Sequence, residues 1–268
     1  MSDRRQTSIG LPGHPKSANN DAFLDSLAVN EGPREILAPF FLKVVDALSD
    51  RGLRLSFEPL STLVRTNEAN KDTWRPLIPL FDPAHGIDDD KAFAVVGRNE
   101  DGDVVATQAA RFYDWPDTSF QEEATSLRLF YRDPSRSKRP AESCGVTCEN
   151  ARIVSGRVVF SGGGWYRRDY RKQWISGLLP RLSRALALTR WSQDFTISIM
   201  AESVVDGGMA RRCGYTNVDY AVNLAGGPVG DVRCALVWMG RRQLLDDLAA
   251  FNATPLDELM AGEDIRAA

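Results

Sequence analysis

The spacing of apolar positions changes between residues 154 and 188. Residues 154–160, VSGRVVF, are rich in β-branched and aromatic side chains, which favours a strand. From residue 175 onward apolar side chains recur every three or four positions, which predicts an amphipathic helix with one buried face. A triple glycine and a basic loop lie between the two. This order of strand, loop and helix is the outline of a phosphate-binding site.

A helix entered through such a loop presents unpaired backbone N–H groups and the positive end of its dipole to an anion. Positive charge is added by four residues of the loop, namely Arg167, Arg168, Arg171 and Lys172. We interpret the loop as a candidate pyrophosphate site. The alternative, a solvated basic surface with no ligand, stays open at this point.

The rest of the chain alternates between helical and extended patterns. The predicted helices occupy residues 39–48, 118–131, 175–188, 203–213 and 241–251. The predicted strands occupy residues 54–57, 92–97, 104–110, 154–160, 195–200, 218–224 and 232–239. Asp101-Gly102 predicts a hairpin turn between the second and third of these strands, and two prolines interrupt residues 73–80.

This order of elements predicts an α/β fold with a mixed sheet and an N-terminal helical extension. Residues 1–32 are polar and without periodicity, and we expect a disordered tail there. Residues 33–268 are expected to form a single domain. Within it we distinguish a variable N-terminal half, a half that contains the candidate pyrophosphate loop, and a C-terminal helix and tail, at residues 33–140, 151–240 and 241–268.

Composition narrows the classes of partner. The chain has 268 residues, of which 43% are hydrophobic and 26% charged, so it can bury a sizeable core. A formal net charge of −3 gives no global reason to expect a nucleic acid or a membrane as partner. No apolar run is long enough for a transmembrane helix, and the first twenty residues lack the apolar core of a signal peptide. We therefore expect a cytoplasmic protein.

Cysteine and histidine are both scarce. The four cysteines are too scattered for a disulfide framework, so reduced thiols are expected. Cys144 and Cys148 have the spacing of two zinc ligands, but the two histidines, His14 and His85, lie far from them in sequence. We expect no metal site. Neither histidine lies in a context typical of a catalytic triad, which disfavours a hydrolase.

Two short segments carry a likeness to a known family. Residues 169–176 read DYRKQWIS, and residues 209–215 read MARRCGY. With the elements around them, the run from Gly156 to Tyr220 resembles the core of the Gcn5-related N-acetyltransferases (GNAT). In that family the fourth strand ends in a bulge and enters a pyrophosphate-binding loop and helix. The resemblance implies a GNAT-like acyl-CoA N-acyltransferase fold.

The family loop runs Arg-x-x-Gly-x-Gly or Ala. Arg171 matches its arginine, whereas Trp174 and Ser176 stand at its two glycine positions. Glycine there allows a close approach of the backbone to the ligand. The resemblance therefore implies that this loop holds its ligand largely through the charge of its four basic residues.

The resemblance also places the thioester carbonyl beside the bulge, near residues 162–165. Gly163, Gly164 and Trp165 join the candidate donor site on this ground. Trp165 and Trp174 can stack on a ligand or simply cover the surface, and both interpretations stay open.

The family's usual general acid is missing. Ala210 stands where many members carry a tyrosine that returns a proton to the leaving thiolate, and Ser203 stands near a common asparagine position. Glu202 is the candidate base or amine anchor, or else an exposed carboxylate that favours the helix dipole. Tyr166 and Tyr170 are candidate acids, or residues that pack the loop onto the core.

The leading hypothesis is transfer of an acyl group from acetyl-CoA or another acyl-CoA to an amine. One alternative is a transferase that takes its acyl group from an acyl carrier protein, whose acidic surface would meet the basic loop. Another is a non-catalytic scaffold that binds a ligand or partner. An exposed edge in the strand pair 218–224 and 232–239 would also allow a homodimer.

Overall fold

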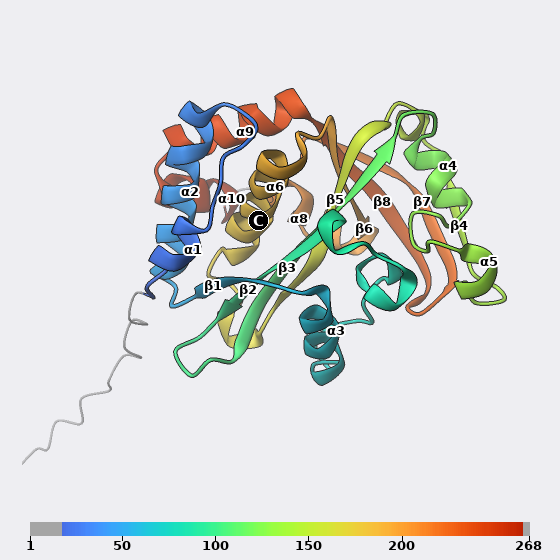
Figure 1. Ribbon diagram of the computed structural model, residues 1–268, viewed down its shortest axis with the longest axis horizontal. Helices are drawn as coiled ribbons and strands as arrows, with labels where there is room; N and C mark the ends of the chain where they lie inside the picture. Colours follow the sequence, from blue (N-terminus) through green and yellow to red (C-terminus); the bar gives the residue numbers. More distant parts are fainter. Residues whose placement is uncertain (1–17, 265–268) are drawn as a thin grey trace, which may run out of the picture.

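One eight-stranded sheet, in the order β1-β2-β3-β5-β6-β8-β7-β4, organises the chain (Figure 1). The computed structural model describes residues 18–264. Only β5 and β6 are parallel, and every other neighbouring pair is antiparallel. The strands are β1 Arg54–Glu58, β2 Ala92–Arg98, β3 Val104–Trp115, β4 Ser143–Val146, β5 Gly156–Tyr166, β6 Phe195–Ala201, β7 Asn217–Gly227 and β8 Gly230–Gly240.

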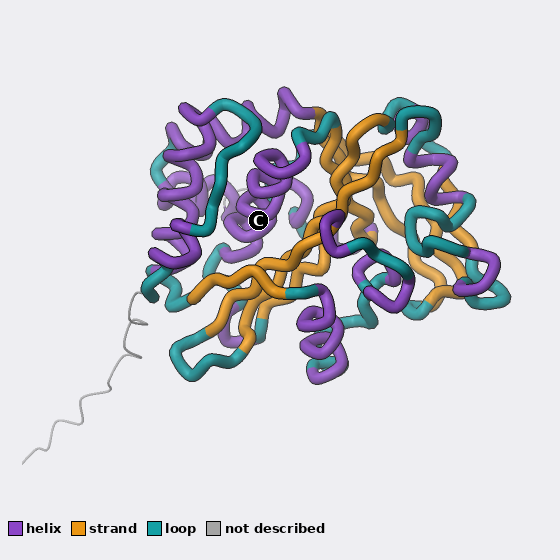
Figure 2. The backbone as a smooth tube through the Cα atoms, viewed as in Figure 1, coloured by secondary structure: helices purple, strands orange, loops and turns teal. Residues whose placement is uncertain are grey.

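Helices lie on both sides of the strands (Figure 2). The helices are α1 Asp21–Asp25, α2 Arg34–Ser49, α3 Leu60–Ala69, α4 Phe120–Thr125, α5 Pro134–Ser137, α6 Ile175–Trp191, α7 Glu202–Asp206, α8 Met209–Arg212, α9 Arg241–Ala253 and α10 Leu256–Asp264. One hydrophobic core packs α1, α2, α6 and α9 on one face, and a second packs α3 and α4 on the other. The mixed α/β fold with N-terminal helices is confirmed.

Most predicted elements are present within a few residues of their expected bounds. The hairpin β2–β3 turns at Gly102, whose φ of 87° suits glycine. The helix predicted at 39–48 begins earlier, at Arg34, which places Pro39 inside α2 and not in its first turn. The pattern at 203–213 divides into α7 and α8 at a pair of glycines, 207 and 208.

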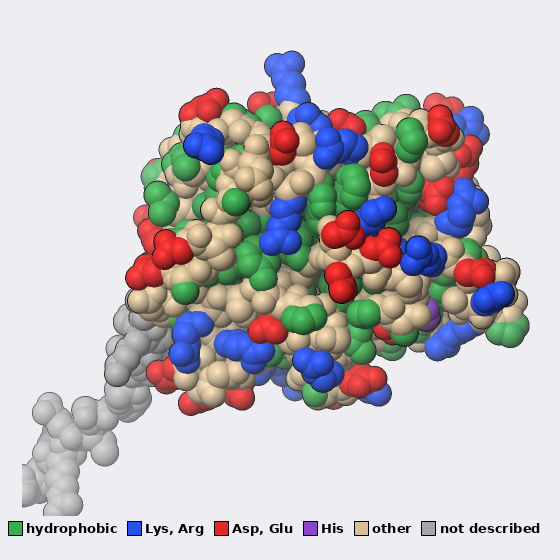
Figure 3. All heavy atoms as spheres, in the orientation of Figure 1, with side chains coloured by type: hydrophobic (Ala, Val, Ile, Leu, Met, Phe, Trp, Pro, Cys, Tyr) green, Lys and Arg blue, Asp and Glu red, His purple; other side chains and the backbone are tan. Residues whose placement is uncertain are grey.

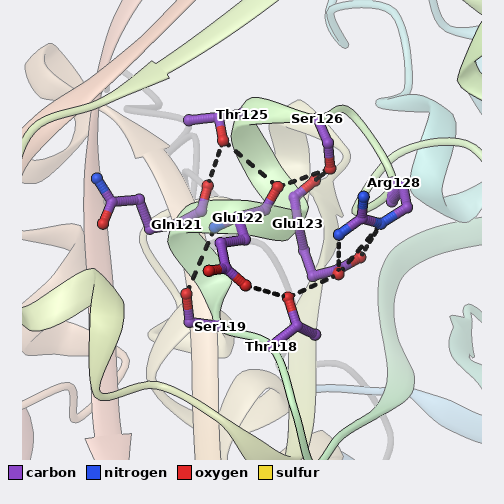
Figure 4. A network of polar contacts seen from close by, with 8 residues as sticks. All are labelled: Thr118, Ser119, Gln121, Glu122, Glu123, Thr125, Ser126 and Arg128. Carbon is purple, nitrogen blue, oxygen red and sulfur yellow. Dashed lines mark hydrogen bonds and ion pairs between the residues drawn. The ribbon is translucent and has the colours of Figure 1, made fainter.

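The helix predicted at 118–131 is much shorter than expected. Ser119 caps α4 by accepting a hydrogen bond from the N–H of Glu122. The chain leaves the helix because Leu127 adopts a left-handed conformation, with φ 64°. Arg128 then folds back to pair with Glu123 at 2.6 Å (Figure 4). The predicted helix was too long because apolar residues continue at helical spacing beyond the end of α4.

Residues 18–32 contradict the expectation of a tail. Asn20 is buried, and its Nδ2 donates to Ser49 Oγ and to the Leu53 carbonyl, each at 2.8 Å. The side chain therefore ties this segment to the end of α2. Residues 1–17 of the predicted tail lie outside the described residues.

The second edge of the sheet also differs from expectation. Strand β4, which the pattern did not predict, pairs with β7 through Val222 and its neighbours up to Ala225. Strand β8 lies inside the sheet between β6 and β7. The edge invoked for a homodimer is thus partly covered within the chain, and the homodimer stays a prediction.

On the face shown in Figure 3, basic and acidic side chains alternate over the surface. This distribution matches the small net charge of −3. Among the described residues no helix has the length and apolar character needed to cross a bilayer. Within that same range no His, Cys, Asp or Glu side chains group as a metal-binding cluster.

Candidate active site

The parallel pair β5–β6 separates after three residues. Its register runs from Val158 opposite Phe195 to Phe160 opposite Ile197, and it ends there. Tyr215 closes the point of separation, where its hydroxyl donates to the Ile197 carbonyl at 3.4 Å. Helices α6 and α8 lie beside this central pair (Figure 1). The splayed strands leave room between them for a ligand.

A β-bulge shapes the β5 side of the opening. Gly163 and Gly164 together oppose the single residue Gln108 of β3. Gly163 has φ 64°, and its carbonyl accepts a hydrogen bond from Thr107 Oγ1 at 2.8 Å. The triple glycine is therefore part of the strand, whereas the sequence pattern had placed the strand end at Phe160. The predicted bulge at residues 162–165 is present.

A cavity of about 350 Å³ occupies the splay. Its walls come from both sides of the sheet, since Cys213 and Tyr215 belong to the core beneath α6 and Phe160 belongs to the opposite core. The cavity also takes in Gly163 and Gly164. It therefore passes between the strands and is open to ligand groups from either face.

A side chain at Gly164 would obstruct this cavity. A Cβ there would lie 2.9 Å from Gln108 Oε1 and 3.6 Å from the Tyr166 hydroxyl. Both distances place polar groups at the cavity wall beside the bulge. A side chain at position 164 would therefore displace Gln108 and narrow the cavity beside the bulge.

A second cavity, of about 700 Å³, adjoins the first and shares Arg75 and Ala201 with it. Its lining carries charges of both signs, from Arg75, Arg233, Glu202 and Asp231. Glu202 Oε1 accepts from Arg233 at 3.2 Å. The nearby Cys234 thiol responds to the same charges: burial and the Glu202 carboxylate raise its pKa, the Arg75 guanidinium lowers it, and together they bring it to about 11.

Glu202 therefore lies at the wall of the second cavity, at the start of α7. The sequence had offered two roles for it, a base and a helix-start carboxylate. In the structure α7 begins at Glu202, and its side chain is 23% exposed beside Arg233. Its charge faces an opening and is partly balanced by one cation.

Fewer cations of the basic loop are free of protein partners than the sequence indicates. Arg167 is engaged by two carboxylates, Asp169 at 2.8 Å and Asp103 at 3.0 Å. Arg171 Nε donates to the Tyr166 carbonyl at 3.0 Å, which ties the loop to the end of β5. Arg168 and Lys172 are exposed at the surface. The predicted set of four equivalent cations is thus divided between anchors and exposed charges.

The structure corrects the interpretation of the Trp174 side chain. It is buried, and its ring stacks parallel to Phe251 of α9 with centroids 6.4 Å apart. The side chain is therefore in the core, neither on a ligand nor at the surface. Its backbone has φ 58°, the left-handed angle that favours glycine, so the loop keeps this turn without the glycine. A Cβ on Gly177 would lie 2.5 Å from the Trp174 ring.

The N-terminal turns of α6 contain an unusual exchange of hydrogen bonds. Pro180 lies inside a continuous helix and lines the first cavity. Proline has no N–H to give to the carbonyl of Ser176, four residues earlier. The thiol of Cys213 instead donates to that carbonyl at 3.4 Å. This contact links Ser176 at the start of α6 to the segment that follows α8.

The two tyrosines of the loop have different surroundings. Tyr166 lines the first cavity, and burial holds its pKa well above the ordinary value. Tyr170 is partly buried against the core, with the Arg167 guanidinium 5.4 Å above its ring. The packing interpretation thus describes Tyr170, and the cavity contains Tyr166 in its wall. Trp165 stacks on Trp74 with centroids 5.6 Å apart, and it does not line either cavity described above.

Several functional candidates escaped the sequence analysis. Arg75 and Gln108 lie in the N-terminal half, where no motif indicated them, and only the tertiary structure brings them to the cavities. Tyr215 was noted as part of a motif, but its hydroxyl at the strand separation was not foreseen. A polar residue inside an apolar strand, as Gln108 is in β3, was the one available signal.

No protein-family model and no curated protein matches the sequence. Among solved structures, mutant forms of a spermidine/spermine N-acetyltransferase from Vibrio cholerae match with 7% identity and a TM-score of 0.43, over 73% of this chain and 97% of that one. NAA60 of Arabidopsis thaliana in complex with acetyl-CoA matches with 9% identity and a TM-score of 0.40, over 70% and 99%. FeeM, an N-acyl amino acid synthase from uncultured soil microbes, matches with 10% identity and a TM-score of 0.40, over 74% and 98%.

Similarity at this level concerns the fold and not the substrate. The predicted features of the fold are present in the chain itself, in its strand order, its single parallel pair, its bulge at Gly163 and the loop that enters α6. The chain therefore has a mixed α/β fold with the bulge that the resemblance implied.

Proposed function

We propose that the protein transfers an acyl group from a phosphopantetheine thioester, in the simplest case acetyl-CoA or another acyl-CoA, to an amine. The observation that carries the proposal is the cavity of about 350 Å³ between β5 and β6. A pantetheine arm is narrow and extended, and its two amide groups can form hydrogen bonds with strand backbones, so it suits a slot between splayed strands. The loop before α6 lies at the end of β5, where the donor's phosphates would follow.

In this proposal the bulge supplies the hydrogen-bond donor for the thioester carbonyl oxygen. Gly163 and Gly164 interrupt the β3–β5 register, and in this proposal a backbone N–H at the bulge donates to the thioester carbonyl oxygen. The amine nitrogen attacks the carbonyl carbon, the C–S bond breaks, and the sulfur leaves as a thiolate. The attacking nitrogen loses its proton to the carboxylate of Glu202.

Tyr166 is assigned to the leaving sulfur, in place of the tyrosine that the family pattern would put at Ala210. Its hydroxyl lies in the first cavity near the bulge. Because burial raises its pKa well above that of a thiol, the phenol stays neutral and stabilises the thiolate by a hydrogen bond. The thiolate then takes its final proton from solvent. We expect Tyr166→Phe to lower kcat with little change in donor affinity.

The test is calorimetric titration of the purified protein with acetyl-CoA and longer acyl-CoA thioesters, followed by an acceptor screen. Gly164→Val should abolish donor binding by filling the cavity. Gly145→Val is the matched control, because the nearest atom to a Cβ at this exposed site on β4 is 4.0 Å away. Equal affinity of the wild type and Gly164→Val would remove the cavity as the donor site.

An acyl carrier protein is a second candidate donor, favoured by the exposure of Arg168, Arg171 and Lys172 at the loop. A carrier presents the same phosphopantetheine arm on an acidic surface. Binding of an acyl carrier without binding of free acyl-CoA would select it. Binding of neither donor would leave the non-catalytic scaffold as the function.

A further inference from the structure

The second cavity, which adjoins the proposed donor slot, is lined by charged side chains of both signs. Glu202 and Asp231 are acidic, and Arg75 and Arg233 are basic. A simple amine needs only the acidic part of such a wall. The presence of cations there calls for a second, anionic group on the molecule that enters.

The charges on this wall are not all balanced by one another. Arg233 pairs with Glu202 at 3.2 Å, and Asp231 Oδ1 accepts from the Gly226 N–H at 2.9 Å in the β7–β8 turn. Within residues 18–264 Arg75 has no ion pair, although it lines both cavities. A guanidinium without a carboxylate partner, at the junction of two cavities, is available to a carboxylate ligand.

The backbone of Arg75 is held firmly even though its side chain has no partner. The buried Asn67 of α3 donates from Nδ2 to the Arg75 carbonyl at 2.8 Å, and its Oδ1 accepts from the Leu77 N–H at 3.1 Å. Trp74 stacks on Trp165 of β5, with the two ring planes 13° apart. These contacts fix the segment against the bulged strand, so that less entropy is lost when the guanidinium binds a ligand.

Apart from Ser203, the remaining residues that line the second cavity are apolar. Pro76 lies on the Arg75 side, and Pro228, Val229 and Val232 belong to the β7–β8 turn and its flank. These side chains suit a small aliphatic group. The wall therefore combines a carboxylate for an ammonium group, a guanidinium for a carboxylate group and apolar contacts for a side chain.

We propose that the acyl acceptor is a small zwitterion with an amine and a carboxylate, such as an α-amino acid with an aliphatic side chain. Arg75 binds its carboxylate, and Glu202 binds its ammonium group. The ammonium group gives one proton to solvent before the neutral nitrogen attacks, and Glu202 takes the second proton after the attack, as in the proposed transfer. The kinetic part of this inference rests on the proposed acyl transfer. Its binding part does not, because recognition of the zwitterion requires only the cavity.

The experiment compares leucine with 3-methylbutylamine, which is leucine without its carboxylate. We expect the wild type to bind leucine about 10- to 100-fold more tightly by calorimetry, with the same preference in kcat/KM when acyl-CoA is supplied. Arg75→Gln should remove the preference for leucine and leave 3-methylbutylamine unchanged, and Arg75→Lys should restore part of it. Arg242→Gln, at a side chain 95% exposed on α9, is the matched control.

The outcomes separate the two proposals. Equal binding of leucine and 3-methylbutylamine to the wild type, or an unchanged preference in Arg75→Gln, would overturn the zwitterion inference while leaving acyl transfer intact. Selective binding of leucine would support the inference even if no acyl group is transferred from acyl-CoA. The absence of transfer would then reject free acyl-CoA as the donor. Failure to bind either leucine or 3-methylbutylamine at millimolar concentration would also overturn the inference.

Discussion

Two regions of the molecule are rich in arginine, and they use it differently. In the loop and the first turns of α6, Arg167 and Arg181 are held by carboxylates of the protein itself. At the junction of the two cavities, Arg75 has a fixed backbone and no ion pair within the described residues. Within the loop, Arg167 is thus engaged by the fold, whereas Arg168 and Lys172 are exposed.

The contrast is sharpest inside α6. Arg184 has no exposed surface, stacks over Tyr215 and lies 3.6 Å from Asp247, which also accepts from Arg181 at 3.0 Å. Two of its nitrogen atoms, Nε and Nη1, are buried without a hydrogen-bond partner. A run of basic residues in a sequence therefore gives no location for a ligand. A cation without an ion-pair partner among the described residues is a better indication of where a ligand binds.

Removal of the carboxylate shared by the α6 arginines should have the largest effect. Asp247→Ala leaves Arg181 and Arg184 as buried charges without compensation, and we expect a loss of about 3–5 kcal/mol in the free energy of unfolding. Asp246→Ala is the control, since Asp246 is 74% exposed and its contact with Arg242 is 3.9 Å long. Denaturant titration measures both. Similar small losses would mean that the α6 arginines are not structural.

Trp174→Gly tests whether the loop keeps its shape through the core. The change restores the residue of the family pattern but removes a ring that packs on Phe251, and we expect a loss of about 3 kcal/mol in stability. Donor affinity should not improve, because the backbone already has φ 58° at this position. Calorimetry with acyl-CoA on the folded variant checks this. Tighter binding would show that the ring itself obstructs the donor.

Arg171→Ala tests an anchor that also carries charge. The side chain ties the loop to the Tyr166 carbonyl at 3.0 Å, and its cation is exposed. We expect acyl-CoA affinity to fall about tenfold, with a smaller difference at high salt because exposed charges are screened. Arg168→Ala separates charge from anchoring, since it removes a cation that is also exposed. Equal losses in both variants would assign the effect to charge alone.

Arg167→Ala should have the smallest effect. Its ion pairs with Asp103 and Asp169 are partly exposed, and such pairs contribute about 0–1 kcal/mol to stability. We expect a change below about 1 kcal/mol and little change in donor affinity, because the neighbouring carboxylates already balance its charge. Thermal unfolding and calorimetry measure the two effects. A large loss of donor affinity would contradict the division between engaged and available cations.

The sequence by itself determined the elements whose local signals agree. The β2–β3 hairpin follows from Asp101-Gly102, the α6 helix follows from its apolar spacing, and the bulge at the triple glycine follows from the family resemblance. Each of these signals depends on neighbours in the chain. That is why the fold class, the bulge and the loop before α6 could be predicted.

The tertiary structure decided which of the predicted residues face a ligand. Trp174 enters the core, Tyr170 packs on the loop, and Tyr166 reaches the cavity, although all three belong to one basic and aromatic run. Arg75 comes to the same cavity from a segment without any motif. The direction of a side chain and its partners depend on contacts between distant segments. Local spacing carries no information about those contacts, whereas it does carry the periodicity of helices and strands.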